Sequence, residues 1–369
     1  MRIGLMLRSL DEKGGVGVYT RYLTEELLDL DQYNQYVLFY RNPSHLGRFA
    51  GYKNATEQVV IAPNKACWDQ IAIPYACWKA KLDVLFHPKF TVPLMAPCRT
   101  VMVLHGAGWF MPESKNFWKS WDLQYVRLMM PVYCKKAAAV LSVSQLTTDI
   151  FNQLFRVPVG KIKTVYFGPG RHFRRIEELS TLEKVKARHL LPDRFILTLA
   201  KYGDGGRKNT KAIFDAYRKV QEKIPHKLVV VGKDCHRFRE DYQFSENGYG
   251  KDIVFTGWVE QEDLPAFYSL ADLFLYPSNV EAFPIPITEA MACGTPIVTS
   301  NVNGLKEVAG DAAVFVDPSR PEEIATAIGQ VLLDSELQKS LSAKSLERAK
   351  TFQWQKCAKE TLSLLESLA

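Results

Sequence analysis

The chain has 369 residues, of which 47% are hydrophobic and 24% charged, values that are ordinary for a soluble globular protein. This length predicts two domains, each large enough to bury a core of its own. No uncharged apolar run approaches the roughly 18 residues of a membrane-spanning helix, and the charges near the N-terminus argue against a signal peptide. Seven scattered cysteines without a C-x-x-C pair indicate free thiols in a reducing compartment, with the cytoplasm as the expected location.

Charge is distributed unevenly along the chain. Residues 1–175 hold 23 Lys and Arg against 12 Asp and Glu, a net charge of +11. Residues 176–369 hold 24 against 28, a net charge of −4, so that the whole chain carries +7. The basic half is expected to meet something anionic, such as a membrane surface, a phospholipid-linked acceptor or a nucleic acid, although an arbitrary surface imbalance explains the difference equally well.

Short apolar segments alternate with amphipathic stretches along the chain, which predicts parallel strands flanked by helices. The strands predicted in the first half are Arg2–Leu7, Tyr36–Tyr40, Val59–Ala62, Val84–His87, Thr100–Leu104 and Ala139–Ser142. Those predicted in the second half are Phe195–Ala200, Lys227–Val231, Ile253–Phe255, Leu273–Tyr276, Pro296–Thr299 and Ala313–Val316. The main predicted helices are Val18–Leu30, Lys208–Lys223, Asp263–Leu270, Pro321–Leu333 and Ser335–Ala349. Two such sets indicate an α/β protein with two Rossmann-like domains, divided near residue 172, and ligands are expected at the carboxyl ends of the strands.

The first candidate binding segment lies between the first predicted strand and the first predicted helix, at Gly14, Gly15, Val16 and Gly17. Glycines let a backbone approach a ligand closely, and free N–H groups at a helix start attract phosphate. The dinucleotide-binding fingerprint is not met, because its third glycine would fall at Thr20, and no phosphate-loop motif occurs. A turn with a purely structural role explains this segment as well as an anion site does.

Two further sets of polar residues follow predicted strands. His105 comes directly after the fifth strand of the first half, where it can hydrogen-bond a substrate hydroxyl or move a proton, although a lone histidine is more often a local hydrogen-bond partner. Arg207 and Lys208 lie on the loop after the first strand of the second half, with Lys201 at the strand end. Such cations at a helix start suit a diphosphate, whereas taken alone a Lys/Arg pair is more often solvated.

The most informative segment is residues 281–294, which holds Glu281 and Glu289 in an otherwise apolar stretch. It follows a predicted strand and contains a short predicted helix, with Pro286 in the first turn and Gly294 at the C-terminal end. Burying two carboxylates is costly unless they bind something, and carboxylates accept hydrogen bonds from the vicinal diols of sugars and ribose. Two acids that interact only with the helix dipole are the alternative.

Glu281 and Glu289, with seven residues between them, resemble the E-x7-E motif of the family-4 retaining glycosyltransferases, which have the GT-B fold of two Rossmann-like domains facing each other across a cleft. The likeness is most specific over residues 255–317 and includes segments 255–259, 270–278 and 304–313. Elsewhere it involves Gly14–Gly17, Leu104–Gly106, Ser142–Ser144 and Phe352–Trp354. The last of these resembles the start of a terminal helix that crosses back onto the N-terminal domain.

This resemblance implies an acceptor-binding domain over residues 1–172, joined by the C-terminal helix 352–369, and a donor-binding domain over residues 173–351. It implies that Glu281 binds the hydroxyls of the donor sugar, Glu289 binds the nucleotide ribose, and His105 lies beside the transferred sugar. The remaining donor contacts would come from Lys208 and Arg207 on the diphosphate, from Lys201, from the backbone of Gly14, Gly15, Val16 and Gly17, and from the backbone at Phe283 and Ile285.

Three positions depart from the family pattern. Ala282 and Pro284 replace glycines that usually follow the first Glu, and Pro284 has no backbone N–H to donate, which bears on the identity of the donor sugar. Lys201 stands where the family usually has Arg, and offers a point charge instead of a bidentate fork. Gly106 follows the histidine where many members have Asp.

The family implies transfer of a hexosyl unit from a UDP- or GDP-sugar to a glycan or lipid-linked acceptor with retention of configuration. Because no nucleophile stands out, we expect front-face displacement, with Lys208 and Arg207 stabilising the leaving diphosphate. Asp29 and Asp31 form a D-x-D pair that follows a predicted helix end and is interpreted as a solvated turn, so neither a metal nor a cofactor is expected. A nucleotide-sugar epimerase on the same architecture is the alternative function.

Two aromatic stripes lie in the basic half. Trp68, Ile71, Tyr75 and Trp78 recur at helical spacing before Lys79 and Lys81, and Trp118, Trp121, Tyr125 and Leu128 alternate with Lys115, Lys119 and Arg127. Aromatic and basic side chains on one helix suit a lipid interface, whereas helical aromatic stripes more often face a protein core. Peripheral contact with the inner face of the membrane is therefore one hypothesis, and no nucleic-acid partner is expected.

Overall fold

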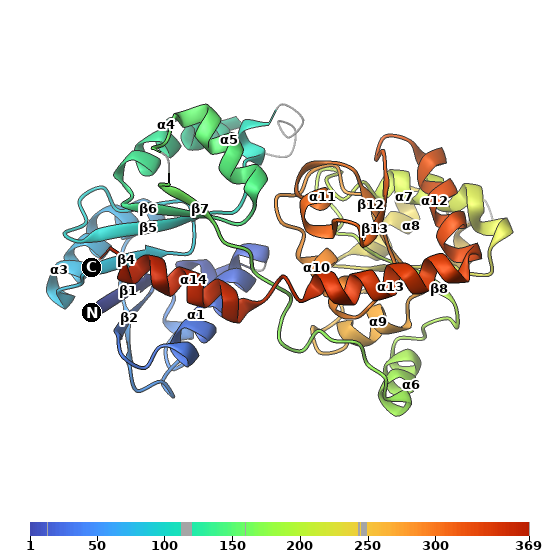
Figure 1. Cartoon of the computed structure of the whole chain (residues 1–369), viewed down its shortest axis with the longest axis horizontal. Coiled ribbons are helices and arrows are strands. Elements are labelled where there is room, and N and C mark those ends of the chain that lie inside the picture. Colours follow the sequence, from blue (N-terminus) through green and yellow to red (C-terminus); the bar gives the residue numbers. More distant parts are fainter. Residues whose placement is uncertain (13, 112–119, 159, 243, 245–248, 369) are drawn as a thin grey trace. The chain divides into compact units, whose positions relative to one another are not determined.

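A computed structural model of the chain describes residues 1–12, 14–111, 120–158, 160–242, 244 and 249–368. The chain forms two compact units (Figure 1). Unit 1 holds the described residues up to Phe167 together with the segment that begins at Gln353, and unit 2 begins at Gly168 and ends at Phe352. The change of unit at Phe167 precedes the position near residue 172 where the turn residues had suggested it.

Unit 1 contains a parallel sheet with the strand order β3-β2-β1-β4-β5-β6-β7. Its strands are β1 (Arg2–Met6), β2 (Gln35–Tyr40), β3 (Ala55–Val59), β4 (Val84–His87), β5 (Arg99–Leu104), β6 (Ala139–Ser142) and β7 (Ile162–Thr164). The strand predictions were wrong at both edges of this sheet. Strand β3 begins at Ala55 rather than at Val59, and β7 was not predicted. Both edge strands are partly exposed and mix polar with apolar residues, so they lack the apolar run of a central strand.

The helices of unit 1 follow the apolar periodicity of the sequence. They are α1 (Gly15–Leu30), α2 (Lys65–Cys67), the π-helical turn η3 (Trp68–Ala72), α3 (Ile73–Ala80), α4 (Ser120–Lys136), α5 (Gln145–Phe155) and α14 (Trp354–Glu366). The C-terminal helix α14 lies beside α1, where the ring of Trp354 packs 5.5 Å from Tyr19 and 4.8 Å from Phe167 (Figure 1). At the other end of α14, Asn34 donates a 3.0 Å hydrogen bond to Glu366.

Unit 2 contains a second parallel sheet, with the strand order β10-β9-β8-β11-β12-β13. Its strands are β8 (Phe195–Leu199), β9 (Lys227–Val231), β10 (Ile253–Gly257), β11 (Leu273–Tyr276), β12 (Ile297–Ser300) and β13 (Ala313–Val316). Its helices are α6 (Leu179–Arg188), α7 (Thr210–Val220), α8 (Phe238–Asp241), α9 (Leu264–Leu270), α10 (Ile285–Ala292), α11 (Asn303–Ala309), α12 (Pro321–Leu333) and α13 (Ser335–Ala349). The predicted strands of this half therefore match the observed ones to within two residues.

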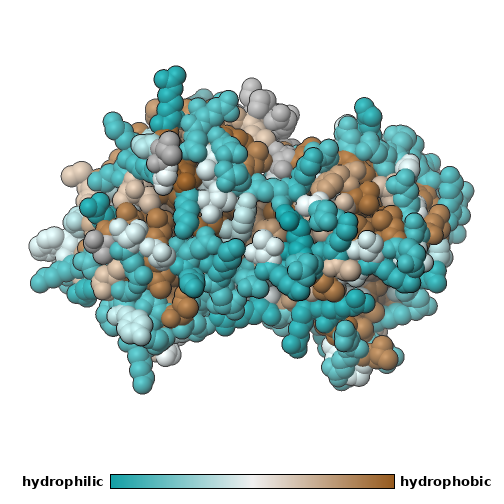
Figure 2. Space-filling view, viewed as in Figure 1, coloured by the Kyte–Doolittle hydropathy of each residue, from teal (hydrophilic) through white to brown (hydrophobic). Residues whose placement is uncertain are grey.

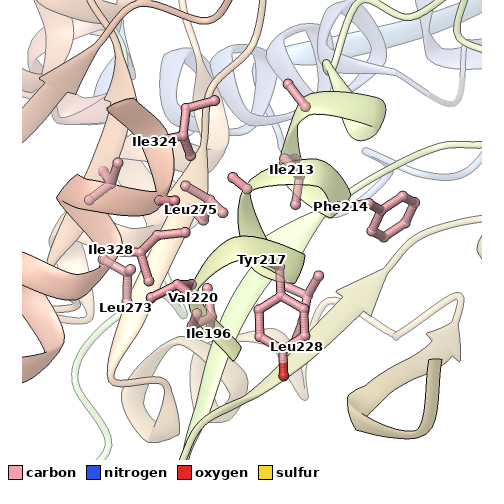
Figure 3. Close-up of a cluster of buried hydrophobic side chains, with 14 of the residues drawn as sticks. Ile196, Ile213, Phe214, Tyr217, Val220, Leu228, Leu273, Leu275, Ile324 and Ile328 are labelled. Atoms are coloured by element: carbon pink, nitrogen blue, oxygen red, sulfur yellow. The ribbon is translucent and has the colours of Figure 1, made fainter. Parts of the chain in front are cut away.

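The core of unit 2 shows why the periodicity of the sequence was informative (Figure 3). Helix α7 places Ile213, Tyr217 and Val220 on one face, at the i, i+4 and i+7 spacing of an amphipathic helix. Helix α12 does the same with Ile324 and Ile328. Both faces cover buried apolar side chains of β8, β9 and β11, among them Ile196, Leu228 and Leu273.

Both sheets place their first and fourth strands side by side at the centre, β1 next to β4 and β8 next to β11. In open parallel sheets the loops that leave such a pair of strands diverge to opposite faces, which leaves room for a ligand at their carboxyl ends. Most of the predicted site residues lie on the connections after β1, β8 and β11, whereas His105 follows β5.

The surface is mostly hydrophilic, but hydrophobic side chains reach it in several places (Figure 2). Of the helices in the described part of the chain, none is both long and apolar enough to cross a membrane. All seven cysteines are unpaired thiols.

Candidate functional site

In unit 2 the loop after β8 is held in place by hydrogen bonds to the side chain of Asp204, within the loop, and to the backbone of the loop after β11. The carboxylate of Asp204 accepts hydrogen bonds from the backbone N–H groups of Gly206 and Lys208, each at 2.9 Å. The backbone N–H of Asn279 donates to the carbonyl of Arg207 at 2.9 Å. These bonds fix the backbone that carries Arg207 and Lys208.

The helix after this loop begins later than predicted, at Thr210 instead of Lys208. Asn209 occupies the N-cap position but does not cap the helix with its side chain. Its amide nitrogen instead donates to the carbonyl oxygens of Pro277 and Pro318, at 3.1 and 2.7 Å. Asn209 thus ties three strand-end loops together and leaves the cationic doublet on the loop.

Three donors converge on a single oxygen of Glu281. Its Oε1 accepts hydrogen bonds from Arg207 Nη1 at 2.7 Å, Lys208 Nζ at 2.6 Å and Tyr276 Oη at 2.8 Å. Within the described part of the chain, no hydrogen bond reaches its other oxygen, Oε2. Lys208 Nζ also lies 4.3 Å above the centre of the Tyr276 ring, a cation–π contact. Burial lowers the pKa of Lys208, and the charge of Glu281 opposes this shift.

The backbone around Glu281 is fixed by a glycine at the start of α11. The N–H of Gly304 donates to the carbonyl of Glu281 at 2.9 Å. A Cβ atom at this glycine would lie 1.9 Å from the carbonyl oxygen of Ala282, a distance that no side chain tolerates. Gly304 is therefore required by the close approach of two backbone segments.

Glu289 lies on α10, whose ends match the sequence analysis: Pro286 is in the first turn, and Gly294 follows the helix with a φ of +71°. The side chain is buried and accepts a 3.0 Å hydrogen bond from Tyr268 Oη. Burial raises the pKa of Glu289 to about 7, against the hydrogen bond from Tyr268 and the charge of Lys208. Lys208 therefore acts electrostatically on both acids of the E-x7-E pair.

The other residues predicted for this site differ in their placement. Phe283 is buried and packs against Phe352, with 5.7 Å between ring centres. Ile285 is the first residue of α10, and its carbonyl accepts a 2.7 Å bond from the hydroxyl of Thr288. Lys201 is exposed and has no hydrogen bond or ion pair with any described residue, so the structure does not bring it into the Glu281 cluster.

In unit 1 the glycine segment is not a loop, as had been expected, but the beginning of α1. Gly14 is the N-cap, and Gly15, Val16 and Gly17 form the first turn, so their N–H groups precede the first intrahelical hydrogen bonds. A Cβ atom at Gly17 would lie 1.9 Å from the carbonyl oxygen of Glu12. The close packing of this turn on the preceding segment explains the glycine at position 17 without a ligand.

His105 follows β5, and its Nε2 lies 2.9 Å from the carbonyl oxygen of Pro88. A carbonyl can only accept, so Nε2 carries the proton and Nδ1 is left as an acceptor. Burial lowers the pKa of His105 to about 4, although the bond to Pro88 opposes the shift. The imidazole is therefore neutral at physiological pH and packs edge-on against Tyr19, with 4.8 Å between ring centres.

Two ion pairs at the same edge of unit 1 were missed by the sequence analysis. Lys89, which follows β4, forms an ion pair with Glu12, which follows β1. Arg8 makes two bonds to the buried carboxylate of Asp69, at 2.8 and 2.9 Å. The rule that led to His105, a polar residue directly after a strand, applies equally to Lys89 and could have found it.

The D-x-D pair of unit 1 is only in part the solvated turn that had been expected, because Asp29 is exposed but Asp31 is not. Asp31 is buried and accepts bonds from Tyr36 Oη at 2.6 Å and from the side chain and backbone of Asn34. Burial opposes ionisation, yet these bonds hold the pKa of Asp31 below its usual value. Asp29 accepts a 2.9 Å bond from Tyr52. Among the residues that the structure describes, no three His, Cys, Asp or Glu side chains gather as metal ligands would.

Sequence comparisons find relatives for most of the chain. Residues 183–348 match the family model described as "Glycosyl transferases group 1". The O-antigen chain mannosyltransferase B of Escherichia coli is 29% identical over 293 residues, which cover 78% of this chain and 75% of that protein. The serotype-specific mannosyltransferase WbdA of Escherichia coli is 28% identical over 230 residues, 60% of this chain but only 28% of WbdA.

Solved structures show the same fold over the whole chain. The HepE protein of Anabaena, crystallised in complex with UDP and glucose, superposes with a TM-score of 0.77 and 17% sequence identity, covering 100% of both chains. At this identity the likeness establishes the architecture of two Rossmann-like units. It does not establish which ligands this chain binds.

Proposed function

We propose that the chain is a glycosyltransferase of group 1 that moves a hexosyl unit from a UDP- or GDP-sugar to a glycan or lipid-linked acceptor with retention of configuration. The match of residues 183–348 to the group 1 model, the mannosyltransferase relatives and the GT-B fold support this proposal. Two relatives, which align over 78% and 60% of this chain, are named mannosyltransferases, which makes a mannosyl unit the first candidate. None of the relatives described above is an epimerase, so the alternative function has no support from them.

The convergence of Arg207, Lys208 and Tyr276 on one oxygen of Glu281 carries this proposal. A carboxylate whose first oxygen is held by three donors cannot rotate freely, and its second oxygen keeps a defined direction. That oxygen is an acceptor for a hydroxyl of the donor sugar. Because the carboxylate is already oriented before the substrate binds, no free energy is needed to reorient it during the reaction, and polar sites stabilise transition states in this way.

The diphosphate of the donor is assigned to Lys208 and Arg207. An ammonium has three N–H donors and a guanidinium has five, and each group uses one N–H donor on Glu281. The remaining donors of both groups can bind phosphate oxygens. Because negative charge grows on the diphosphate as the sugar leaves, these cations bind the transition state more strongly than the substrate.

The transfer step is a front-face displacement. The bond between the anomeric carbon and the diphosphate oxygen breaks while a bond from the acceptor oxygen to the same carbon forms on the same face. The acceptor proton passes to an oxygen of the leaving diphosphate, so that no protein side chain is consumed. We assign to the neutral His105 a hydrogen bond from a substrate hydroxyl to its free Nδ1.

Glu289 is assigned to the ribose of the nucleotide. Tyr268 binds its Oε2, and a vicinal diol can donate to the carboxylate from the other side. Because the pKa of Glu289 lies near 7, the carboxylate that accepts these bonds is fully formed only above neutral pH. Donor affinity is therefore expected to fall as the pH is lowered from 8 to 6.

The test is an assay of nucleoside diphosphate release from a panel of UDP- and GDP-sugars, with and without a glycan acceptor. Release that requires one donor and the acceptor, with the product anomer matching the donor anomer by NMR, is the expected result. A donor whose sugar is isomerised without release of the diphosphate would identify an epimerase instead. We also expect turnover to continue in excess chelator, and its loss there would show that a metal takes part.

A further inference from the structure

The first aromatic stripe of unit 1 is divided between core and surface. Trp68 is fully buried, and its indole N–H donates to the carbonyl of Val60 at 2.8 Å. Ile71, Tyr75 and Trp78, which follow it at i, i+4 and i+7 on η3 and α3, are exposed, Trp78 to 65%. Core packing therefore explains the position of Trp68, whereas no other part of the described chain buries the other three side chains.

The second stripe is exposed throughout its described part. Trp121, Tyr125, Leu128 and Val132 lie on one face of α4, at i, i+4, i+7 and i+11, and Trp121 is 81% exposed. The opposite face of α4 packs into the core of unit 1. Trp118, Lys115 and Lys119, which the sequence analysis had added to this stripe, lie outside the described residues.

The two exposed faces belong to neighbouring helices. The connections from β3 to β4 and from β5 to β6 cross the sheet in the same direction, so right-handed crossovers place α3 and α4 on the same side of it. A hollow of about 530 Å³ separates their C-terminal ends, lined by Leu82 just after α3 and by Lys136, the last residue of α4. Together, these exposed side chains of η3, α3 and α4 form what we call the α3–α4 face.

Basic residues surround one end of this face. Lys79, Lys81, Lys135 and Lys136 lie at the C-terminal ends of the two helices, and all are exposed. Arg99 lines the hollow, as do Asp83 and Thr100, and the buried hydroxyl of Thr100 has no hydrogen-bond partner among the described residues. Five cations thus stand beside a single acid, next to the hollow.

We propose that the α3–α4 face docks unit 1 on the surface of a membrane that contains anionic phospholipids. Trp and Tyr rings are the side chains that settle at the boundary between head groups and acyl chains, and Lys and Arg beside them meet the lipid phosphates. The apolar residues enter the boundary region, while Arg99 and Lys136 hold a lipid phosphate at the mouth of the hollow.

The charge of the α3–α4 face distinguishes between two possible partners, an anionic membrane and a second copy of the chain. A symmetric dimer through this face would bring the same cations of two copies together, because each side of a two-fold interface presents the same patch. Like charges facing each other oppose such an interface, whereas an anionic bilayer attracts every one of them. The observations therefore favour lipid as the occupant.

The proposal is tested by co-sedimentation of the full chain with vesicles, without donor or acceptor, so that the outcome does not depend on the proposed transferase activity. Vesicles of phosphatidylglycerol and phosphatidylethanolamine are expected to bind the chain at low salt and to release much of it at high salt. Pure phosphatidylcholine vesicles are expected to bind it weakly. Brominated lipids should quench tryptophan fluorescence in the bound state.

Two double variants locate the surface. Trp78→Ser with Trp121→Ser should weaken binding at least tenfold and remove most of the quenching by brominated lipid. Arg99→Gln with Lys136→Gln should weaken it about thirtyfold, at about 1 kcal/mol for each cation near an anionic surface. The matched controls are Tyr33→Ser and Lys53→Gln, which are exposed in unit 1 beside β2 and β3, and both should bind like the parent chain.

Three outcomes would overturn the proposal. The first is the absence of binding to anionic vesicles at low salt. The second is binding that the two double variants reduce no more than the controls do. The third is a dimer, seen by sedimentation velocity without lipid, that Trp78→Ser with Trp121→Ser dissociates, since the face would then be covered by a second copy.

Discussion

The first six strands of each unit have the same order, and the two units place charged residues after equivalent strands, but with the signs exchanged. In unit 1 the acid Glu12 follows the first strand and the cation Lys89 follows the fourth, and the two form an ion pair. In unit 2 the cation Lys208 follows the first strand and the acid Glu281 follows the fourth, and they too are paired. In each case an ion pair joins the loops that leave the two central strands.

The difference lies in how many charges meet at each point. In unit 1 the charges are matched one to one, since Lys89 pairs with Glu12 and Arg8 with Asp69. In unit 2 two cations share one oxygen of Glu281, and the nearby Glu289 is half protonated near neutral pH. Unit 2 therefore offers an anionic ligand two cations that keep unused N–H donors, although Asp204 on the same loop offsets part of their charge, whereas unit 1 pairs each of its two cations with an acid of its own.

The net charge of the two halves does not indicate where this cluster lies. The first half carries a net charge of +11 and the second half −4, yet the cations to which we assign the diphosphate lie in the second. Part of the surplus of the first half stands around the hollow beside α3 and α4. Net charge of a domain thus indicates what its surface meets, and the strand-end loops indicate what its site binds.

The largest expected effect comes from removing the cation that acts on both acids. Lys208→Met should lower kcat by about 10²–10³-fold, the usual loss when one group that stabilises developing charge is removed. Diphosphate release measures this. Lys211→Met, three residues further along the chain in an exposed i,i+4 pair with Asp215, is the control and should keep parental activity. Equal losses in both variants would contradict the assignment of Lys208.

The second effect concerns the titration of Glu289. Its folded pKa of about 7 lies above the usual value of 4.5, so the protonated form stabilises the fold fully below about pH 4.5, and this contribution is lost as the pH rises through 7. Glu289→Gln cannot ionise and should be more stable than the parent at pH 8, by on the order of 3 kcal/mol, but not at pH 4.5. Thermal unfolding at both pH values measures the difference. A difference that is the same at both pH values would show that Glu289 does not titrate as described.

The third effect compares the two glycines that pack on the acid-bearing segments. Gly17→Ala and Gly304→Ala each place a Cβ atom 1.9 Å from a carbonyl oxygen, and overpacking of this kind usually costs about 1–3 kcal/mol. Unfolding by urea should show a loss of stability in both. Only Gly304→Ala should also impair donor binding, because it displaces the backbone of Glu281. Gly14→Ala, where a Cβ atom would meet nothing within 4 Å, is the control.

The smallest effect is expected at the ion pair of unit 1. Glu12→Gln removes one charge from a one-to-one pair, and we expect at most about a tenfold loss of transfer, about 1.4 kcal/mol, with unchanged affinity for the donor. The measurement is kcat/KM for the acceptor beside Kd for the nucleotide sugar. A loss of donor affinity in Glu12→Gln would mean that the two units do not divide their tasks in this way.

Local features account for what could be predicted. The strands Val84–His87 and Leu273–Tyr276 were predicted with their observed bounds, because a fully buried parallel strand is a short apolar run that can be read directly. The ends of α10 followed from Pro286 and Gly294, whose backbone preferences are properties of the residue alone. The edge strand Ile162–Thr164 had no such signal, since its pairing with β6 defines it.

The sequence by itself determined the two-domain α/β architecture, the position of the central strands and the presence of two acids and two cations at strand ends. Only the tertiary structure decided that Glu281 receives both cations on one oxygen, that Glu12 pairs with Lys89, and that Trp68 is buried while Trp78 is exposed. Periodicity tells which residues share a face of a helix. Whether another element covers that face, and which distant charge comes within reach, depends on contacts between segments far apart in the chain.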